Sequence, residues 1–98
     1  MPYSDITLIR NVSGLTTAEK VDADITPLIT IADNIIDEYT NKTWSESDGD
    51  YQQIKLVSAL LVSWLASLSL AGGRERGEAF RSAGYDVLDK ILVRGKIV

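Results

Sequence analysis

The 98-residue chain contains no cysteine and no histidine. The absence of cysteine excludes disulfide bonds and thiolate chemistry, so the chain needs no oxidising compartment. Without histidine, the chain has neither the commonest metal ligand nor the usual general base near neutral pH. Its many serines also have no evident base to activate them as nucleophiles. We therefore expect a protein that is not an enzyme and that uses no cofactor or metal.

A secretory leader pattern is lacking as well, because the N-terminal residues MPYSDITLIR contain no basic region followed by a long apolar stretch. We expect a chain that is made and kept in a cytoplasm.

One long apolar run is present, IKLVSALLVSWLASLSLA at residues 54–71, with no charged residue between Lys55 and Arg74. It is shorter than the roughly 20 apolar residues of a spanning helix, contains four serines and has no basic flank at its start. We therefore expect a buried helix covered on several faces. One face carries small residues that permit close helix packing, namely Ala59, Ser63, Ala66 and Ser67. A bulkier stripe comprises Leu56, Leu60, Trp64 and Leu68.

Three further helices are predicted around this run. The first covers about residues 5–12, with Ser4 as its N-cap and Gly14 as its stop. A polar loop follows at residues 15–25, with one helical turn near residues 18–21. The pair Thr26 and Pro27 then marks the start of a second helix, which ends near Asn41. Its predicted buried stripe is Leu28, Ile31, Ala32, Ile35, Ile36 and Tyr39, with Asp33, Asn34, Asp37 and Glu38 opposite.

The central helix is expected to begin near Asp48 or Asp50 and to stop at the pair Gly72 and Gly73. The last helix is expected over residues 75–93, and its predicted buried stripe is Ala79, Phe80, Ala83, Val87, Leu88, Ile91 and Leu92. Within it, Gly84 indicates either a close helix crossing or simple tolerance of glycine. Residues 94–98, RGKIV, form a flexible or partner-binding tail. The predicted fold is a single all-α domain, a small bundle of about four helices around the long apolar one.

The acidic loop at residues 42–50, KTWSESDGD, contains one aromatic side chain, Trp44. This indole either folds back over the core, which we favour, or contacts a partner.

Charge is divided unequally between the two halves of the chain. Residues 1–50 carry three basic and ten acidic residues, a net charge of −7, whereas residues 51–98 carry seven basic and four acidic residues, a net charge of +3. Such segregation allows the acidic side of one copy to meet the basic side of the next. Solvated helix faces that merely differ in charge are the simpler interpretation.

Known ligand motifs are not matched. The segment GGRERGE at residues 72–78 superficially resembles a phosphate-binding loop, but Glu78 stands where lysine is needed. The acidic pairs in the loops lack the spacing of a calcium loop. Arg74, Arg76 and Arg81 are positioned to contact DNA, yet the sequence pI of about 4.6 is unlike that of a dedicated DNA-binding protein.

The order of parts resembles the head–tail connector, or head-completion adaptor, proteins of tailed bacteriophages. The resemblance rests on the helix ending at Gly14, the acidic linker into ITPLI (25–29) and a helix closing in YTNKTW (39–44). A long Leu/Ala/Ser helix and a final amphipathic helix follow. The resemblance implies a virion neck protein that forms a ring of about twelve copies under the portal. Such a ring extends the DNA channel and docks the next neck or tail protein.

By position, the resemblance implies that the second and last helices make subunit contacts. It also implies that the acidic loop and the C-terminal tail contact the portal or the channel. The candidate partner or subunit contacts are Trp44, Glu46, Asp48, Arg74, Arg76, Arg81, Arg94, Lys96, Ile97 and Val98. The alternative function is a small helical regulatory module, such as a DNA-binding or anti-repressor protein, for which the three arginines are the only support.

Overall fold

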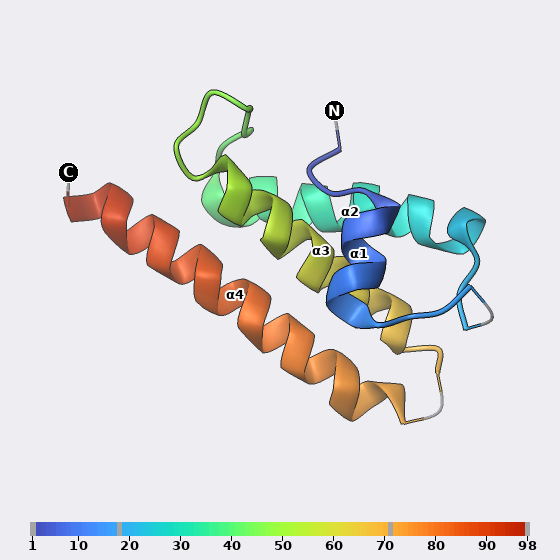
Figure 1. The fold of residues 1–98 in the computed structure, drawn as a ribbon. Coiled ribbons are helices and arrows are strands. Elements are labelled where there is room, and N and C mark those ends of the chain that lie inside the picture. Colours follow the sequence, from blue (N-terminus) through green and yellow to red (C-terminus); the bar gives the residue numbers. More distant parts are fainter. Residues whose placement is uncertain (1, 18, 71, 98) are drawn as a thin grey trace.

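The computed structural model describes residues 2–17, 19–70 and 72–97, with residues 94–97 described by their backbone alone. These residues form four helices and no strand: α1 (Ile6–Ser13), α2 (Asp22–Thr40), α3 (Tyr51–Ser67) and α4 (Gly73–Ile97). Figure 1 shows the other helices arranged around α3, which contacts all three and packs most extensively on α4. The predicted all-α bundle around the central apolar run is confirmed.

The central helix α3 contains the largest share of the core, and Ile54, Val57, Leu61 and Val62 have no exposed surface. Two of its buried serine hydroxyls are satisfied within the helix, since Ser63 and Ser67 each donate a 2.7 Å hydrogen bond to the carbonyl oxygen four residues earlier. Asp50 occupies the predicted N-cap position, but its side chain does not make the expected capping hydrogen bond. The helix ends at Ser67, earlier than expected, because residues 68–70 form a turn in which the Leu70 amide bonds the Ser67 carbonyl. In the predicted bulky stripe, Leu56 and Leu68 are exposed.

Glycines in α4 allow it to approach α3 closely. A Cβ atom added at Gly84 would lie 3.3 Å from Cδ2 of Leu61, and one added at Gly77 would lie 3.2 Å from the carbonyl oxygen of Trp64. Of the alternatives that the sequence left open for Gly84, the structure shows the close helix crossing.

These two glycines are expected to respond differently to alanine. Both substitutions gain about 1 kcal/mol of helix propensity. At Gly84 the new methyl group meets the flexible end of Leu61, so we expect unchanged or slightly higher stability. At Gly77 the new methyl group meets the carbonyl oxygen of Trp64, which can move only if the backbone of α3 moves with it. We therefore expect a lower melting temperature. Thermal unfolding followed by circular dichroism compares them, and equal melting temperatures would contradict this account.

The buried face of α4 matches the prediction in part, since Leu88 and Ile91 are buried as expected. Gly77, Gly84, Leu88 and Ile91 are buried, whereas Ala79 and Ala83 are exposed. The glycines, which the apolar pattern did not include, determine which side of α4 faces α3. The helix also continues to Ile97 rather than ending near Val93, since no proline interrupts residues 94–97.

Helix α2 begins at Asp22, before the predicted Thr26–Pro27 start, so Pro27 lies inside the helix. The guanidinium of Arg10 holds this early start in place, because it donates to the Lys20 carbonyl at 2.9 Å and to the Asp22 carboxylate at 2.6 Å. Asn41 ends the helix in a left-handed conformation, as expected.

The α2 stripe was also partly wrong. Ile25 and Ile29 are buried in place of the predicted Ile31 and Tyr39, which are exposed. Tyr39 instead reaches across to α4, where its ring meets that of Tyr85 edge-on. Its hydroxyl donates to the carboxylate of Asp89.

At the N-terminus, α1 is capped by Asp5 and not by the predicted Ser4. The Asp5 carboxylate accepts a 2.8 Å hydrogen bond from the Leu8 amide. Gly14 ends the helix with φ of 71°, as expected. Ser4 is buried and contributes to a polar network described below.

Candidate functional site

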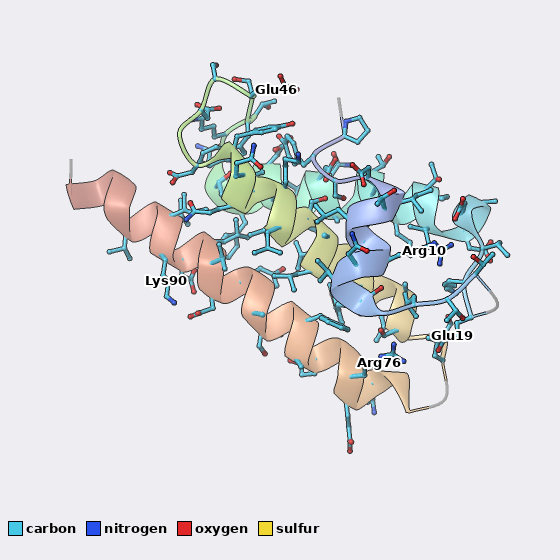
Figure 2. All side chains as sticks on the ribbon, viewed as in Figure 1. Arg10, Glu19, Glu46, Arg76 and Lys90 are labelled. Carbon is cyan, nitrogen blue, oxygen red and sulfur yellow. The ribbon has the colours of Figure 1, made fainter. Side chains whose placement is uncertain are left out.

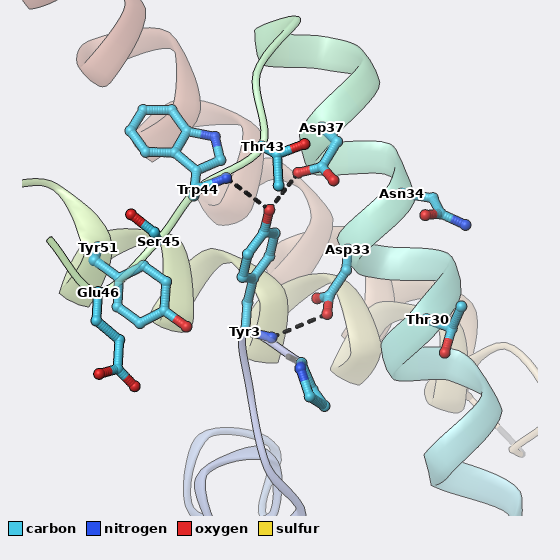
Figure 3. Close-up of a pocket in the computed structure, with 11 residues that line it drawn as sticks. Tyr3, Thr30, Asp33, Asn34, Asp37, Thr43, Trp44, Ser45, Glu46 and Tyr51 are labelled. Atoms are coloured by element: carbon cyan, nitrogen blue, oxygen red, sulfur yellow. Dashed lines mark hydrogen bonds between the residues drawn. The ribbon is translucent and has the colours of Figure 1, made fainter. Parts of the chain in front are cut away.

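A cleft of about 670 Å³ opens between the N-terminal segment, α2 and the loop that joins α2 to α3 (Figure 3). We call it the acidic cleft. Its lining residues are Pro2, Tyr3, Thr30, Asp33, Asn34, Asp37, Thr43, Trp44, Ser45, Glu46 and Tyr51. They include three aromatic rings and three carboxylates but no basic residue.

Tyr3 joins the three walls of the acidic cleft. Its amide donates to Asp33 Oδ2 at 2.9 Å, and its hydroxyl donates to Asp37 Oδ1 at 2.5 Å. The same hydroxyl accepts a 2.9 Å hydrogen bond from the Trp44 amide. The Tyr3 ring also packs edge-on against Tyr51. A residue close to the N-terminus therefore fixes both α2 and the following loop.

A second set of bonds connects this anchor to the core helix. Ser58 of α3 donates to Asp33 Oδ1 at 2.6 Å, and its oxygen lies 2.7 Å from that of Ser4. Because the single Ser58 hydroxyl proton is used on Asp33, Ser4 must be the donor to Ser58. Burial raises the pKa of Asp33 above its usual range, although the bonds from Ser58 and Tyr3 oppose the shift.

The Tyr3 hydroxyl provides a pH-dependent test of this network. Burial, followed by the hydrogen bond to Asp37, raises its pKa from 10.0 to about 12. A folded-state pKa above the unfolded value means that the stabilisation is complete below pH 10.0 and is lost as the pH rises toward about 12.

We expect Tyr3→Phe to lower the free energy of unfolding by about 1–2 kcal/mol at neutral pH, because the Trp44 amide loses its acceptor and Asp37 its donor. The difference from wild type should shrink between pH 10.0 and about 12. Urea unfolding across this range measures it. Tyr85→Phe, which leaves the network intact, is the control, and a pH-independent difference at Tyr3 would refute the assignment.

Trp44 is tucked over the core, the alternative that we favoured from the sequence. The half-buried ring packs against the core cluster, and its Nε1 donates to Thr40 Oγ1 at 3.0 Å. The ammonium group of Lys42 lies 4.2 Å from the ring centroid. Trp44 therefore contributes a wall of the acidic cleft while closing the core beneath it.

The two predicted acidic contacts in this loop have different surroundings. Asp48 closes the loop on itself, accepting from the Ser45 amide at 2.8 Å and from Lys42 at 2.9 Å. These bonds lower the pKa of Asp48. Glu46 is exposed and lines the acidic cleft. Of the two, Glu46 is the one placed to meet a partner.

The three arginines expected to act together are separated in their roles. Arg76 donates to the Ser13 carbonyl at 3.1 Å and pairs with Glu19 at 3.6 Å. Figure 2 shows the side chains of Arg76 and Glu19 at one end of the bundle. Arg81 lies over the rings of Trp64 and Tyr85 and pairs with Glu78.

Arg74 is exposed. In the described structure the three side chains therefore do not form one phosphate-binding cluster. The side chains of Arg94, Lys96 and Ile97, and all of Val98, lie outside the described residues, so their predicted contacts stay predictions.

A second surface is more apolar. Between α3 and α4 lies a groove of about 620 Å³, the α3–α4 groove, lined by Gln53, Leu56, Asp86, Val87, Asp89, Lys90 and Val93. Leu56 is 39% exposed and Val93 is 55% exposed.

The described residues were compared with the requirements of a metal site and of a membrane-spanning helix. They contain no group of three or more histidine, cysteine, aspartate or glutamate residues placed to hold a metal ion. None of their helices is long and apolar enough to cross a membrane. Comparison with known protein families, curated proteins and solved structures found no match.

The sequence did not predict the roles of Tyr3, Asp33 and Asp37. The two aspartates were expected on the solvent side of α2. A signal was nevertheless present, because their four-residue spacing places both on one face of α2, next to its buried stripe.

Proposed function

We propose that this chain is a structural head–tail connector of a tailed bacteriophage. In this role it forms a ring under the portal, extends the DNA channel and docks the next neck or tail protein. The order of helices and linkers, which resembles that family, supports the proposal. The observation that carries it is the α3–α4 groove, where Leu56 and Val93 leave apolar surface uncovered on a small bundle.

A second copy of the chain is the proposed occupant of that surface. Charge is segregated between the halves of the sequence, with −7 before residue 51 and +3 after it. The groove itself is lined by Asp86, Asp89 and Lys90, so a basic part of the second copy would complement it, and head-to-tail contacts of this kind close into a ring when the rotation between neighbours allows.

Several polar side chains are engaged in hydrogen bonds and ion pairs within the chain, which supports a structural role. Asp33 and Asp37 accept hydrogen bonds from Tyr3 and so support the fold. Two of the three arginines behind the DNA-binding alternative are engaged within the chain. A salt dependence equivalent to several phosphate contacts in a DNA titration would favour that alternative instead.

The proposal is tested with the purified chain and the portal protein encoded in the same genome. Native mass spectrometry and negative-stain microscopy should show closed rings of the chain on the portal. A monomer that ignores the portal even at high concentration would overturn the proposal.

A pair of variants locates the contact. We expect Leu56→Asp combined with Val93→Asp to reduce ring formation strongly, because carboxylates would replace the two exposed apolar side chains of the α3–α4 groove. Val21→Asp combined with Ile31→Asp is the matched control, since both side chains are 47% exposed and lie outside the groove. Equal assembly of both variants would remove the groove from the interface.

A further inference from the structure

The acidic cleft has the chemistry of a site for cationic side chains. The cleft is lined by the half-buried ring of Trp44, by the rings of Tyr3 and Tyr51, which are 5% and 8% exposed, and by the carboxylates of Asp33, Asp37 and Glu46. Aromatic faces and carboxylates both attract ammonium and guanidinium groups. No lysine or arginine is among the lining residues, although the Lys42 ammonium lies 4.2 Å from the centroid of the Trp44 ring.

The walls of the cleft are held in place before any ligand arrives. Tyr3 is 5% exposed and bonds to Asp33, Asp37 and the Trp44 amide. Through Ser58, the same network is attached to the central helix. A preorganised cleft loses little conformational freedom when it binds. Its volume of about 670 Å³ lies in the range of sites that take a few side chains.

The matching segment is at the other end of the same sequence. Residues 94–98, RGKIV, combine two cations with two aliphatic side chains. Figure 1 shows the C-terminal end of α4 projecting past the beginning of α3, with no other element beside it. The helix directs this segment away from the N-terminal segment of its own chain. A neighbouring molecule is thus better placed to receive it.

We propose that the acidic cleft of one copy receives the basic C-terminal segment, residues 94–98, of a second copy. One of the two cations, Arg94 or Lys96, would meet the carboxylates, since their spacing of two residues places them on different faces of α4, and an aliphatic side chain would pack on the aromatic walls. The contact joins unlike surfaces and so repeats from copy to copy. It deepens the proposed ring function by naming one of its subunit contacts.

A peptide titration tests the docking independently of ring formation. The probe is a synthetic peptide of residues 89–98, DKILVRGKIV, added to the full-length protein labelled with ¹⁵N. We expect saturable shifts of the Trp44 indole and the Tyr3 amide, with affinity falling as salt is raised. Shifts confined to other surfaces, or no saturable binding, would overturn the proposal.

Charge reversal supplies the controls. Glu46→Lys should weaken peptide binding about tenfold, because it turns an attraction into a repulsion. Glu46 is exposed, so this variant should fold normally. Glu38→Lys, an equal charge change on α2 outside the cleft, should leave binding unchanged. A peptide with Arg94→Glu and Lys96→Glu should not bind wild type. If Glu46→Lys and Glu38→Lys weakened peptide binding equally, the effect would come from the net charge of the protein, and the docking would be refuted.

The same variants separate this inference from the proposed function. Rings on the portal with no peptide binding would overturn the docking and leave the proposed function standing. Charge-dependent peptide binding at Trp44, without any ring on the portal, would support the docking and overturn the proposed function. In full-length protein, Glu46→Lys combined with Lys96→Glu should recover part of the association that either change alone removes.

Discussion

Replacing Gly73 with alanine is expected to lower the free energy of unfolding by about 3 kcal/mol, because a methyl group has no room there. A Cβ atom at Gly73 would lie 1.7 Å from the carbonyl oxygen of Ser67 and 2.7 Å from its carbonyl carbon. Both atoms belong to the backbone at the end of α3, so neither can rotate aside as a side chain would. The start of α4 must move away from α3, which weakens the most extensive helix contact in the molecule.

Urea unfolding measures this effect, with Gly49→Ala as the matched control. Gly49 has no atom within 4 Å of an added Cβ and does not have a positive φ. Its replacement should leave stability unchanged or raise it by up to about 1 kcal/mol through the unfolded state. If Gly73→Ala proved as stable as Gly49→Ala, the described packing at the start of α4 would be wrong.

Leu61→Ala is expected to cost about 2–5 kcal/mol, a large part of the 5–15 kcal/mol that stabilises a typical domain. Leu61 has no exposed surface and lies at the crossing of α3 and α4, where its Cδ2 limits the space beside Gly84. Truncation leaves a cavity that neighbouring helices can close only in part. Denaturant unfolding should show a lower midpoint with an unchanged slope.

Two further variants make this prediction specific. Leu68→Ala removes the same atoms from a side chain that is 52% exposed, so its cost should stay below that of Leu61→Ala. Gly84→Ala should be more favourable in the Leu61→Ala protein than in wild type, because the new methyl group enters the space left by Leu61. If the effects of Leu61→Ala and Gly84→Ala on the free energy of unfolding were strictly additive, residues 61 and 84 would not share the space at the crossing.

The general fold could be predicted because it follows from patterns local to the sequence. The run at residues 54–71 is apolar on nearly all sides, and Gly14 and Asn41 end helices by the left-handed conformation. The helix start at Asp22 could not be predicted in this way. It depends on hydrogen bonds from Arg10, twelve residues earlier, which extend α2 in spite of Pro27.

The acidic cleft was less predictable than the fold. Its loop was recognised as a candidate contact from Trp44 and Glu46, which are close in sequence. The opposite wall depends on bonds from Tyr3 to Asp33 and Asp37, which lie 30 and 34 residues away. Helical periodicity carries no information about such distant pairs, so both aspartates were assigned to the solvent side.

The order of the helices has a consequence for synthesis on the ribosome. Helices α1 and α2 barely touch each other, and each packs mainly on α3, which follows them in the chain. When the first two helices emerge from the exit tunnel, the α3 surface that they later cover is still inside the tunnel. Isolated helices are marginal without such packing. The N-terminal half therefore stays largely unfolded until residues 51–67 appear, and cooperative folding begins only then.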